Sequence, residues 1–521
     1  MLTAATRLKT PPVLIAGGGP VGLATAALLA SHGIASVVIE ADDSFCTGSR
    51  AICLSRRSLE ILDWCGATNA VTAKGLPWTG GRSYFRADEV LQFNMPHDAS
   101  QRFAPMTNIQ QFYVEEYALA AAQKNWPGKI DMRWGTRLDA VNQNAQGVTA
   151  SVSKQGQAEV ITADWLIACD GGRSTVRDVM GLQLKGVQYD GRYVIVDVKQ
   201  KSTRLQTHAV ERLAWFDPPS NPGSTVLMHR QPDDIWRIDY QVRDDEDPLE
   251  AVKPENVLPR VKAHLAWIGE VEPWESQWIS IYNAKCLSMD NYRHGRTFFA
   301  GDAAHMVPIF GVRGLNSGLD DAGNLAWKLA AVIKGQAGDA LLDTYNTERR
   351  AAALINIEFG SKSTEFMSPP HHGFSLMRDA ALRLASSTPA VRSLINPRQS
   401  TPVRYPTAST DTRAASPGYV APDARISTNG KIQHLSQLFG RGYTLLCFGN
   451  AINVSGVKTV PLNASTDALG DARQRYEADM QTALLVRPDG YIAARWDEAS
   501  IAEVAEALQR DLHLEDQHAS V

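Results

Sequence analysis

The residues with the clearest potential for chemistry lie in a glycine-rich turn near the start of the chain. The turn, residues 17–22 (GGGPVG), follows an apolar run at residues 13–16 and precedes an Ala/Leu-rich stretch. An apolar strand, a glycine turn and a helix in this order are typical of a dinucleotide-binding unit. The unpaired N–H groups and the positive dipole end of such a helix attract phosphates. The alternative is a tight strand–helix turn without a ligand.

Three glycines of this turn have mechanical roles in a dinucleotide site. Gly17 permits the tight turn, Gly19 lets the backbone approach a pyrophosphate, and Gly22 lets the helix pack closely on the strand. The turn therefore predicts backbone contacts with a phosphate-containing ligand.

An acidic residue completes the pattern. A second apolar run, residues 36–39, ends at Glu40, which lies 18 residues after Gly22. A carboxylate at this place accepts hydrogen bonds from ribose hydroxyls, and its charge disfavours a 2′-phosphate. The complete pattern predicts a dinucleotide site, but it does not distinguish NAD from FAD.

Two further polar side chains stand where they could meet such a ligand. Arg50 lies in a loop, and Asp170 follows an apolar run at residues 165–168. Arg50 is equally compatible with a cation near the cofactor and with a solvated loop side chain. Asp170 opens the turn CDGGRSTVR, which is either structural or places its carboxylate near phosphates or ribityl hydroxyls.

A second glycine-rich region lies past residue 300. A buried strand expected at residues 297–300 leads into GDAAH, which contains Asp302. A glycine-rich loop follows, and Asn316 lies just before a helix expected from Leu319. Amides at a helix N-terminus stabilise negative charge on a ligand. This region is the second candidate for the binding site.

Residues 183–290 separate the two glycine-rich regions and contain short strand-like runs between loops rich in Pro, Asp and Asn. They predict an antiparallel sheet inserted between two halves of the nucleotide domain. In the run IWRIDYQV, alternation places Trp236, Ile238 and Tyr240 on one face. That face either lines a pocket for a flat apolar ligand or is simply core.

The remaining chain predicts a third region. Residues 366–400 form a helical segment, residues 401–425 read as a linker, and residues 426–521 form a small α/β domain. Without a Cys-x-x-Cys, this domain has no redox chemistry of its own. The fold class is therefore α/β and α+β, with a discontinuous Rossmann-like domain that comprises residues 1–182 and 291–365.

The composition excludes several other classes of protein. The 521 residues carry a formal net charge of −4, which offers no electrostatic basis for binding nucleic acid or an anionic membrane. No apolar run approaches the ~18 residues that a membrane helix needs. The six scattered cysteines lack the spacing of a disulfide framework or a metal site. We therefore expect reduced thiols, no metal and a cytoplasmic location.

Three segments together resemble a known family. GGGPVG with Glu40, CDGGRSTVR at residues 169–177, and GDAAHMVPIFGVRGLNSGLDDAGNLAWKL at residues 301–329 are similar to the class A FAD-dependent aromatic hydroxylases of the para-hydroxybenzoate and phenol hydroxylase type. The region after residue 401 resembles the thioredoxin-like C-terminal domain of the phenol hydroxylase branch. The resemblance implies FAD, rather than NAD, in the first site.

The resemblance also implies roles for individual residues. It assigns cofactor contacts to Gly17, Gly19, Pro20, Val21, Gly22, Glu40, Arg50, Gln111, Asp170, Asp302, Gly314, Leu315 and Asn316. Asp302 matches the aspartate that hydrogen-bonds the ribityl chain. Residues 314–316 match the backbone that meets the pyrimidine edge of the flavin.

The implied reaction is the hydroxylation of a small aromatic substrate, such as a phenol, through a flavin C4a-hydroperoxide, with NADH or NADPH as transient reductant and O₂ as oxidant. Tyr240 and Arg313 are the candidates for a catalytic side chain. One alternative is a flavin enzyme that acts on a non-phenolic substrate by epoxidation, halogenation, or antibiotic or polyketide modification. Another is an NAD-dependent dehydrogenase. The sequence is compatible with a homodimer.

The chain departs from the family pattern at one loop. The family usually has Gly-Gly-Gln-Gly where this chain has Gly-Val312-Arg313-Gly, and Ala51 replaces the aspartate that follows the loop arginine in phenol hydroxylase. Arg313 would place a cation beside the flavin edge or the substrate entrance. This departure favours an acidic substrate.

Overall fold

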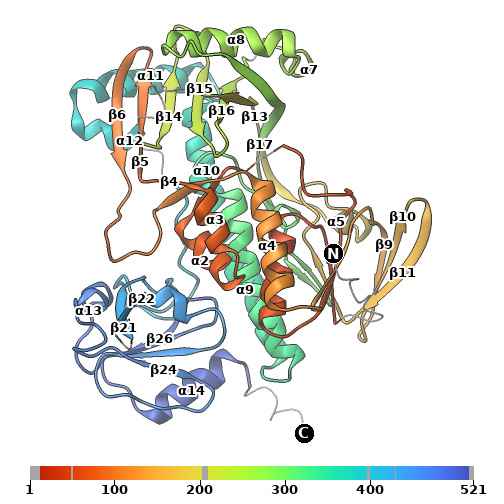
Figure 1. Cartoon of the computed structure of the whole chain (residues 1–521), viewed down its shortest axis with the longest axis vertical. Coiled ribbons are helices and arrows are strands. Elements are labelled where there is room, and N and C mark those ends of the chain that lie inside the picture. The colour runs from red at the N-terminus through yellow and green to blue at the C-terminus, as the bar shows by residue number, and fades with distance from the viewer. Residues whose placement is uncertain are drawn as a thin grey trace.

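The structure, a computed structural model, describes residues 12–48, 51–201, 209–243, 245–395, 399–428 and 430–514. Arg50 lies outside these ranges, so its role stays a prediction. Figure 1 shows an elongated molecule with an antiparallel sheet at one end and the C-terminal region at the other. Among the described helices, none is long and apolar enough to span a membrane.

The glycine-rich turn belongs to a six-stranded sheet in the middle of the molecule. Its strands run in the order β18 (Arg293–His294), β19 (Thr297–Phe299), β12 (Trp165–Ala168), β1 (Val13–Ala16), β2 (Ser36–Ile39) and β8 (Ile130–Arg133). From β19 to β8 all neighbours are parallel. The carboxyl ends of β1, β12 and β19 therefore meet at one edge, which brings together the turns at residues 17–22, 169–173 and 301–305.

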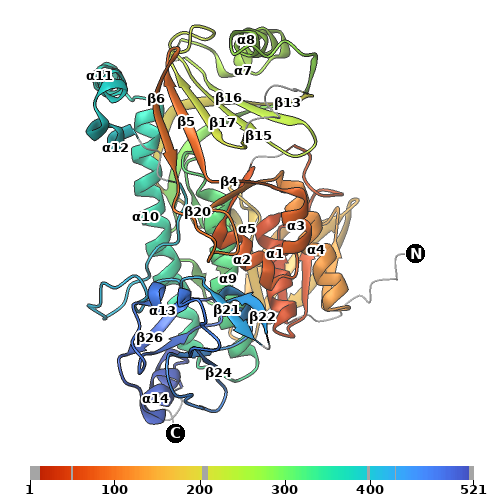
Figure 2. The ribbon, with the colours of Figure 1, turned by 60° about the vertical axis from the view of Figure 1, so that its left-hand side comes forward.

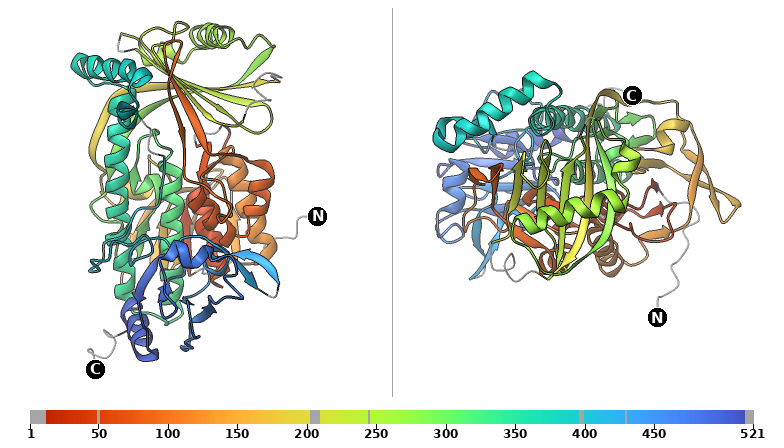
Figure 3. Two further views of the ribbon diagram at one scale, coloured as in Figure 1. Left: turned by 90° about the vertical axis from the view of Figure 1, so that its left-hand side faces the viewer. Right: turned by 90° about the horizontal axis from the view of Figure 1, so that it is seen from above.

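Helices cover this sheet. Helix α1 (Pro20–Ser31) packs against both α4 (Gln111–Asn125) and α9 (Gly314–Ile333). Helix α10 (Asp343–Met367) runs beside α9 along the length of the molecule (Figures 2 and 3). Helix α2 (Arg56–Trp64) begins at Ser55, whose side chain accepts a hydrogen bond from the Ser58 amide, as an N-cap does.

The antiparallel sheet has eight strands. They run in the order β20 (His305–Met306), β17 (Trp274–Ser288), β13 (Lys185–Gln200), β16 (Ile235–Gln241), β15 (Thr225–Arg230), β14 (Arg212–Phe216), β5 (Gly80–Phe85) and β6 (Asp88–Asn94). The sheet extends beyond the predicted residues 183–290, because the hairpin β5–β6 pairs with β14 in parallel. Pairing between strands distant in sequence depends on the tertiary fold, which local patterns do not specify.

The outer face of this sheet is covered. Helices α7 (Pro248–Ala251) and α8 (Pro254–Trp267) lie across it (Figures 1 and 3). Trp236, Ile238 and Tyr240 belong to one buried apolar cluster with Val257 and Leu265 of α8. The face predicted as a possible pocket is therefore core. The inner face of the sheet points toward the interior of the molecule.

Smaller elements complete this part of the fold. They are β3 (Cys53–Ser55), α3 (Thr68–Lys74), β4 (Leu76–Trp78), β7 (Met106–Asn108), β9 (Arg137–Gln143), β10 (Val148–Lys154), β11 (Gln157–Ala163), α5 (Thr175–Val179), α11 (His372–Ser387) and α12 (Arg392–Ile395). Strands β3, β7 and β4 form one small sheet, and β11, β10 and β9 form another.

The C-terminal region forms a separate layered unit, as predicted. Its sheet runs in the order β24 (Lys458–Pro461), β23 (Thr444–Cys447), β25 (Ala483–Val486) and β26 (Ile492–Trp496). Beside it lie the hairpin β21 (Arg425–Thr428) and β22 (Lys431–His434) and the helices α13 (Asp471–Tyr476) and α14 (Ile501–Asp511). Only β23 and β24 are parallel, which is the thioredoxin-like arrangement.

A buried ionic network joins this unit to α9 and α10. Arg487 donates hydrogen bonds to both carboxylate oxygens of Glu348 (2.5 and 2.9 Å), and Lys328 Nζ lies 2.6 Å from Glu348 Oε2. Burial alone would raise the pKa of Glu348, but the charges of Arg487 and Lys328 hold it well below its usual range. Glu348 therefore balances two buried cations at the junction.

We expect Glu348→Gln to destabilise the protein by about 3–5 kcal/mol, because the variant leaves the buried Lys328 without its anion and Arg487 with Asp489 alone. Differential scanning calorimetry should show a lower Tm at pH 7. The difference in Tm between the variant and wild type should narrow as the pH falls below 4.5, the ordinary pKa of a Glu side chain. A carboxyl whose pKa is lowered by folding contributes its full stabilisation above its unfolded pKa and loses it as the pH falls toward its folded pKa.

Glu358→Gln is the matched control. It makes the same substitution on the same helix, where the side chains of Glu358 and Lys362 form an exposed ion pair. Its Tm should equal that of wild type. Equal Tm values for Glu348→Gln and wild type at pH 7 would contradict the stabilising role of the network.

Candidate active site

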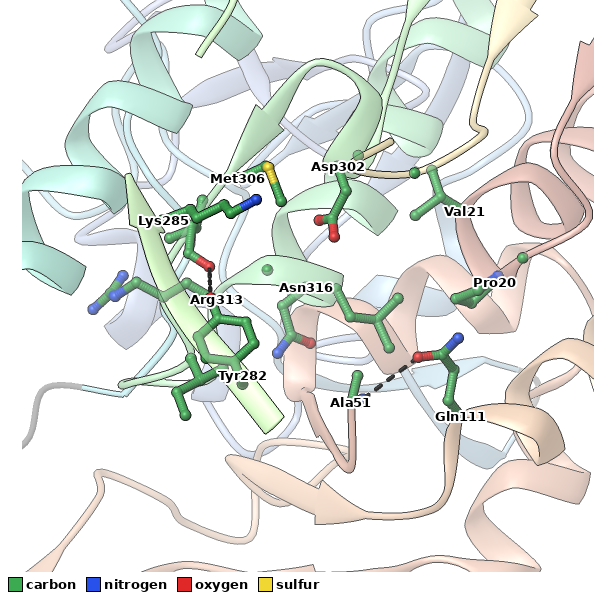
Figure 4. Close-up of a pocket in the computed structure, with 18 of the residues that line it drawn as sticks. Pro20, Val21, Ala51, Gln111, Tyr282, Lys285, Asp302, Met306, Arg313 and Asn316 are labelled. Atoms are coloured by element: carbon green, nitrogen blue, oxygen red, sulfur yellow. Dashed lines mark hydrogen bonds between the residues drawn. The ribbon is translucent and has the colours of Figure 1, made fainter. Parts of the chain in front are cut away.

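One cavity of about 780 Å³ lies between the six-stranded and the eight-stranded sheets. Of the predicted site residues, those that line it are Gly17, Gly19, Pro20, Val21, Glu40, Gln111, Asp170, Asp302, Arg313, Gly314, Leu315 and Asn316. The two glycine-rich regions, nearly 300 residues apart in the chain, thus face one space (Figure 4). Gly22 lies just behind the wall, in α1.

The glycine turn has the geometry that its sequence predicts. Gly17 has φ +104°, and a Cβ there would lie 2.4 Å from the carbonyl oxygen of Cys169. A Cβ on Gly22 would lie 2.0 Å from the carbonyl oxygen of Gly17. At Gly19, in contrast, a Cβ would meet no atom within 4 Å. The turn is therefore closely packed against the protein behind it and open toward the cavity, as a phosphate cradle must be.

Glu40 stands at the end of β2 and braces this turn. Its Oε2 accepts a hydrogen bond from the Gly18 amide (2.7 Å), and its Oε1 accepts one from the Asp42 amide (3.1 Å). Each carboxylate oxygen retains a further lone pair. Glu40 can therefore hold the turn and still accept hydrogen bonds from ribose hydroxyls.

Two further predicted residues line the cavity and accept hydrogen bonds from other residues of the protein. Asp170 Oδ1 accepts a hydrogen bond from Ser174 Oγ (2.5 Å), and Oδ2 accepts one from the Val176 amide (3.0 Å). Gln111 Oε1 accepts one from the Ala51 amide (3.4 Å; Figure 4). The Asp170 carboxylate thus organises the start of α5, and a direct contact with a cofactor stays a prediction.

Asp302 projects into the cavity from a short 3₁₀ helix, residues 301–303 (Figure 4). Asp321, which is fully buried, fixes this turn: its Oδ2 accepts from the Gly301 amide (2.9 Å) and lies 2.6 Å from His305 Nε2. Its Oδ1 accepts from Arg349 Nε (2.7 Å). The side chain of Asp302 itself stays exposed to the cavity. A buried ionic cluster therefore presents one carboxylate to a ligand.

The loop before α9 is held by the side chain of Asn316. Its Oδ1 accepts hydrogen bonds from the Ser55 amide (2.8 Å) and from Ser58 Oγ (2.6 Å), and its Nδ2 donates to the carbonyl of Val312 (2.6 Å). Val312 has φ +58°, which is unusual for a β-branched residue. Asn316 thus positions the backbone of residues 314–316, where α9 begins without a side-chain cap.

Arg313 lines the cavity, but its guanidinium is engaged elsewhere. Nη1 donates to Asn356 Oδ1 (2.8 Å), Nη2 donates to the carbonyl of Gln399 (3.2 Å), and the group lies 5.1 Å from the Phe359 ring centroid. Figure 4 shows the guanidinium directed away from Asp302 and Asn316. Arg313 thus supports its loop, and its role as a cation beside the flavin edge or the substrate entrance stays a prediction.

Tyr240 does not face the cavity. It lies 2% exposed in the cluster beneath α8, on the outer face of the sheet. Its selection as a catalytic candidate was wrong because alternation defines two faces without showing which one a helix covers.

The inner face carries charged residues that the sequence analysis missed. Arg237 and Asp239 alternate with the outer-face residues of β16, and Arg212 and His229 lie on the neighbouring strands; all four line the cavity. The sequence analysis did not select them because it assigned the possible ligand pocket to the apolar face of β16. The two charges within an expected strand were the available signal, since charged residues are almost never fully buried unless paired.

One of these residues has an oxygen available for a ligand. Asp239 is 7% exposed, and its Oδ1 is buried without a hydrogen-bond partner among the described residues. Burial raises the pKa of Asp239 to about 7, against the opposing charge of Arg237. Arg237 itself is paired with Asp197 through two hydrogen bonds of 2.8 Å. The Asp239 carboxyl can therefore gain or lose a proton near neutral pH.

These features fit a bound FAD. The open Gly19 backbone, the uncapped start of α1 and Glu40 suit the pyrophosphate and the adenosine ribose. Asp302 suits the ribityl chain, and the amides of residues 314–316 suit an electron-rich ring edge. The charged inner face of the eight-stranded sheet closes the far part of the same cavity, where a substrate can lie.

Comparison with known proteins agrees with this geometry. Residues 10–359 match the family described as FAD binding domain, and residues 414–513 match the family described as aromatic-ring hydroxylase, C-terminal. The chain is 28% identical to a 3-(3-hydroxy-phenyl)propionate/3-hydroxycinnamic acid hydroxylase of Mycolicibacterium smegmatis, over 96% of this chain and 93% of that protein. It is 27% identical to a hydroxylase of the same name from Klebsiella pneumoniae, over 93% of this chain and 92% of that protein.

Solved structures share the whole fold. The flavin-dependent monooxygenase PieE, solved with FAD and substrate, superposes with a TM-score of 0.82 at 23% identity, over 97% of this chain and 99% of that one. The anhydrotetracycline hydroxylase OxyS of Streptomyces rimosus superposes with a TM-score of 0.75 at 26% identity, over 97% and 99% of the two chains. The arrangement of the three regions is thus that of known flavoenzymes.

Proposed function

Because this chain belongs to the family of FAD-dependent aromatic hydroxylases, we propose that it hydroxylates a phenolic or related aromatic substrate with NADH or NADPH as reductant and O₂ as oxidant. The observation that carries the proposal is the single cavity shared by the glycine turn, Asp302 and the inner face of the eight-stranded sheet. It offers a cofactor-binding end and a substrate end in one continuous space.

FAD, when bound, would take electrons from NAD(P)H and activate O₂, so that one oxygen atom enters the aromatic ring. The first turn of α1 would hold its pyrophosphate and Glu40 its ribose. Asp302 would accept hydrogen bonds from the ribityl hydroxyls, and the amides of residues 314–316 would stabilise negative charge on the ring system.

Asp239 is the proton acceptor that the geometry favours. A phenol reacts faster with an electrophilic oxygen when its hydroxyl proton is lost, and a base works best when its pKa lies near the working pH. Asp239 lines the cavity, its buried Oδ1 has no hydrogen-bond partner in the described chain, and its pKa is raised to about 7. We therefore assign the Asp239 carboxyl the role of taking the substrate hydroxyl proton.

Apolar side chains complete the substrate end. Ile195 and Leu227 on the sheet, and Ile309 and Phe310 on the opposite loop, line the cavity. They would press against the faces of an aromatic ring and keep water from the reacting atoms.

The sequence has one dinucleotide fingerprint, which supports transient rather than stored NAD(P)H. None of the six cysteines, all in the described ranges, forms a disulfide, which is consistent with a cytoplasmic protein. A homodimer remains compatible with the chain.

A substrate screen tests the proposed reaction. The purified yellow protein should oxidise NADH or NADPH faster when the right phenol is added, with hydroxylated product equal to the NAD(P)H consumed and little H₂O₂. Phenol-stimulated oxidation that gives only H₂O₂ would argue against hydroxylation. The screen should include polycyclic polyketides, because the anhydrotetracycline hydroxylase shares this fold and modification of an antibiotic or polyketide is the alternative reaction.

A further inference from the structure

A buried ion pair lies beside Asp239 on the inner face of the eight-stranded sheet. Arg237 of β16 is buried, and its Nε and Nη2 each donate a hydrogen bond of 2.8 Å to the carboxylate of Asp197. Its guanidinium also lies 5.5 Å from the centroid of the Trp278 ring. Asp197 stands opposite Arg237 on β13, and Trp278 stands opposite Asp197 on β17. Two strands on one side of β16 therefore hold this guanidinium.

Asp239 follows two residues later on the same face and has apolar neighbours instead. Its register partners are Leu227 of β15 and Ile195 of β13. In the described chain its buried Oδ1 has no hydrogen-bond partner, and Arg237 donates to Asp197 rather than to Asp239. Residues two apart in a strand are separated by roughly 7 Å. Arg237 and Asp239 therefore interact through charge, without a hydrogen bond between them.

The two members of the ion pair act on Asp239 in opposite directions. Burial raises the pKa of Asp239 to about 7, the charge of Arg237 lowers it, and the charge of Asp197 raises it. With Arg237 alone, the Asp239 carboxyl would ionise at lower pH and would be a weaker base. With Asp197 alone, it would stay protonated at neutral pH. The pair together leaves Asp239 close to the state that burial gives it.

Other titratable groups also face the cavity. Burial raises the pKa of the Cys53 thiol to about 12 and lifts that of Tyr193 well above its usual range, so both are neutral at pH 7. Burial and the nearby arginines lower the pKa of His229 to about 3, so it is uncharged as well. Further charged groups of the cavity wall are Arg212, Lys285 and Arg313, together with Glu40, Asp170 and Asp302 near the cofactor. Burial and the adjacent ion pair account for the pKa of Asp239 without them.

We infer that Asp197 is a positioning residue, which holds Arg237 away from Asp239 and thereby keeps the Asp239 carboxyl able to accept the proton of the substrate hydroxyl. The inference rests on the proposed function and adds a residue to its machinery. Asp197 is not among the residues that line the cavity, so it acts through Arg237 rather than on the substrate. An apolar pair of similar size often stabilises a fold as well as a buried ion pair does, so stability alone does not account for these charges.

The pH dependence of kcat/KM for a phenolic substrate tests the inference. Wild type should lose activity below about pH 7, where Asp239 becomes protonated. In Asp197→Asn this decline should move to lower pH by about one unit, and the rate above it should fall, because Arg237 without its anion weakens the base. In Arg237→Met the decline should move to higher pH by about one unit. The double variant removes both charges together, so its decline should return to the wild-type position.

Asp217→Asn is the matched control for the substitution. Asp217 also forms an ion pair with an arginine, Arg86 (2.8 Å), but it does not line the cavity. Its pH profile should equal that of wild type. A merely structural Asp197 would lower the Tm of Asp197→Asn and leave the decline at the wild-type pH, which would overturn the inference. If Asp197→Asn does not fold, an unmoved decline in Arg237→Met would overturn it instead.

Infrared difference spectra of the FAD-loaded protein follow the same proton without turnover. The C=O stretch of a protonated Asp239 is present in wild type and absent from Asp239→Asn, so the difference between the two proteins belongs to this carboxyl. Its titration with pH should shift downward in Asp197→Asn and upward in Arg237→Met. Equal titrations in wild type and both variants would show that the ion pair does not act on Asp239.

The outcome is separable from that of the proposed reaction. Shifted infrared titrations in a protein that hydroxylates no phenol would refute the hydroxylase function and leave the influence of Asp197 on Asp239 in place. Hydroxylation of a phenol with unshifted titrations and an unmoved pH profile would support the function and refute the inference.

Discussion

Asp302→Ala should be purified with most of its flavin lost. A charge-assisted hydrogen bond to a ribityl hydroxyl is worth about 1.5–3 kcal/mol, so the Kd for FAD should rise by roughly ten- to a hundredfold. The fold should not change, because the Asp302 side chain is exposed to the cavity, whereas the turn below it is fixed by Asp321. The ratio of flavin to protein absorbance measures the loss, and fluorescence titration of the apoprotein with FAD measures the Kd.

Asp88→Ala is the matched control, since Asp88 is also an exposed aspartate but lies in the β6 hairpin, outside the cavity. It should keep its full flavin content. Asp302→Asn, which retains an acceptor oxygen but not the charge, should fall between the two. An Asp302→Ala protein that stays fully yellow and active would show that the assignment of the ribityl contact is wrong.

Asp239→Asn should reduce kcat/KM for a phenolic substrate by roughly 10²- to 10⁴-fold, which is the usual contribution of a general base. The amide has the size of the carboxylate but cannot take a proton. In wild type, log kcat/KM should fall as the pH drops below about 7, because Asp239 becomes protonated there and can no longer act as a base. Steady-state rates of product formation between pH 5 and pH 9 measure both effects.

The pH profile separates a chemical role from a structural one. In Asp239→Asn the decline below pH 7 should disappear, while the flavin content and the Tm remain close to those of wild type. A phenol acidic enough to be ionised at pH 7 should restore much of the rate, since it does not need a base. A variant with wild-type rate and an unchanged pH profile would exclude Asp239 as the proton acceptor.

The sequence alone determined the parts of the site that depend on local backbone geometry. The glycine turn at residues 17–22 needs only a strand, a tight turn and a helix in succession, and these are encoded within a few neighbouring residues. The same holds for the N-cap at Ser55 and for the hairpin of β25 and β26. The segments at residues 17–40, 169–177 and 301–329 together indicated the family, and thus FAD, because each is a local motif that can be recognised from neighbouring residues.

The tertiary structure alone decided which charged groups face the substrate. Strand alternation sorted residues 235–242 into two faces, but only the packing of α8 showed that Tyr240 is core and that Asp239 lines the cavity. Likewise, whether a buried arginine is paired depends on contacts between distant segments. Arg237 pairs with the Asp197 carboxylate, whereas Arg313 donates hydrogen bonds to the Asn356 side chain and to the Gln399 carbonyl. Long-range packing sets burial and pairing, and local sequence does not encode either.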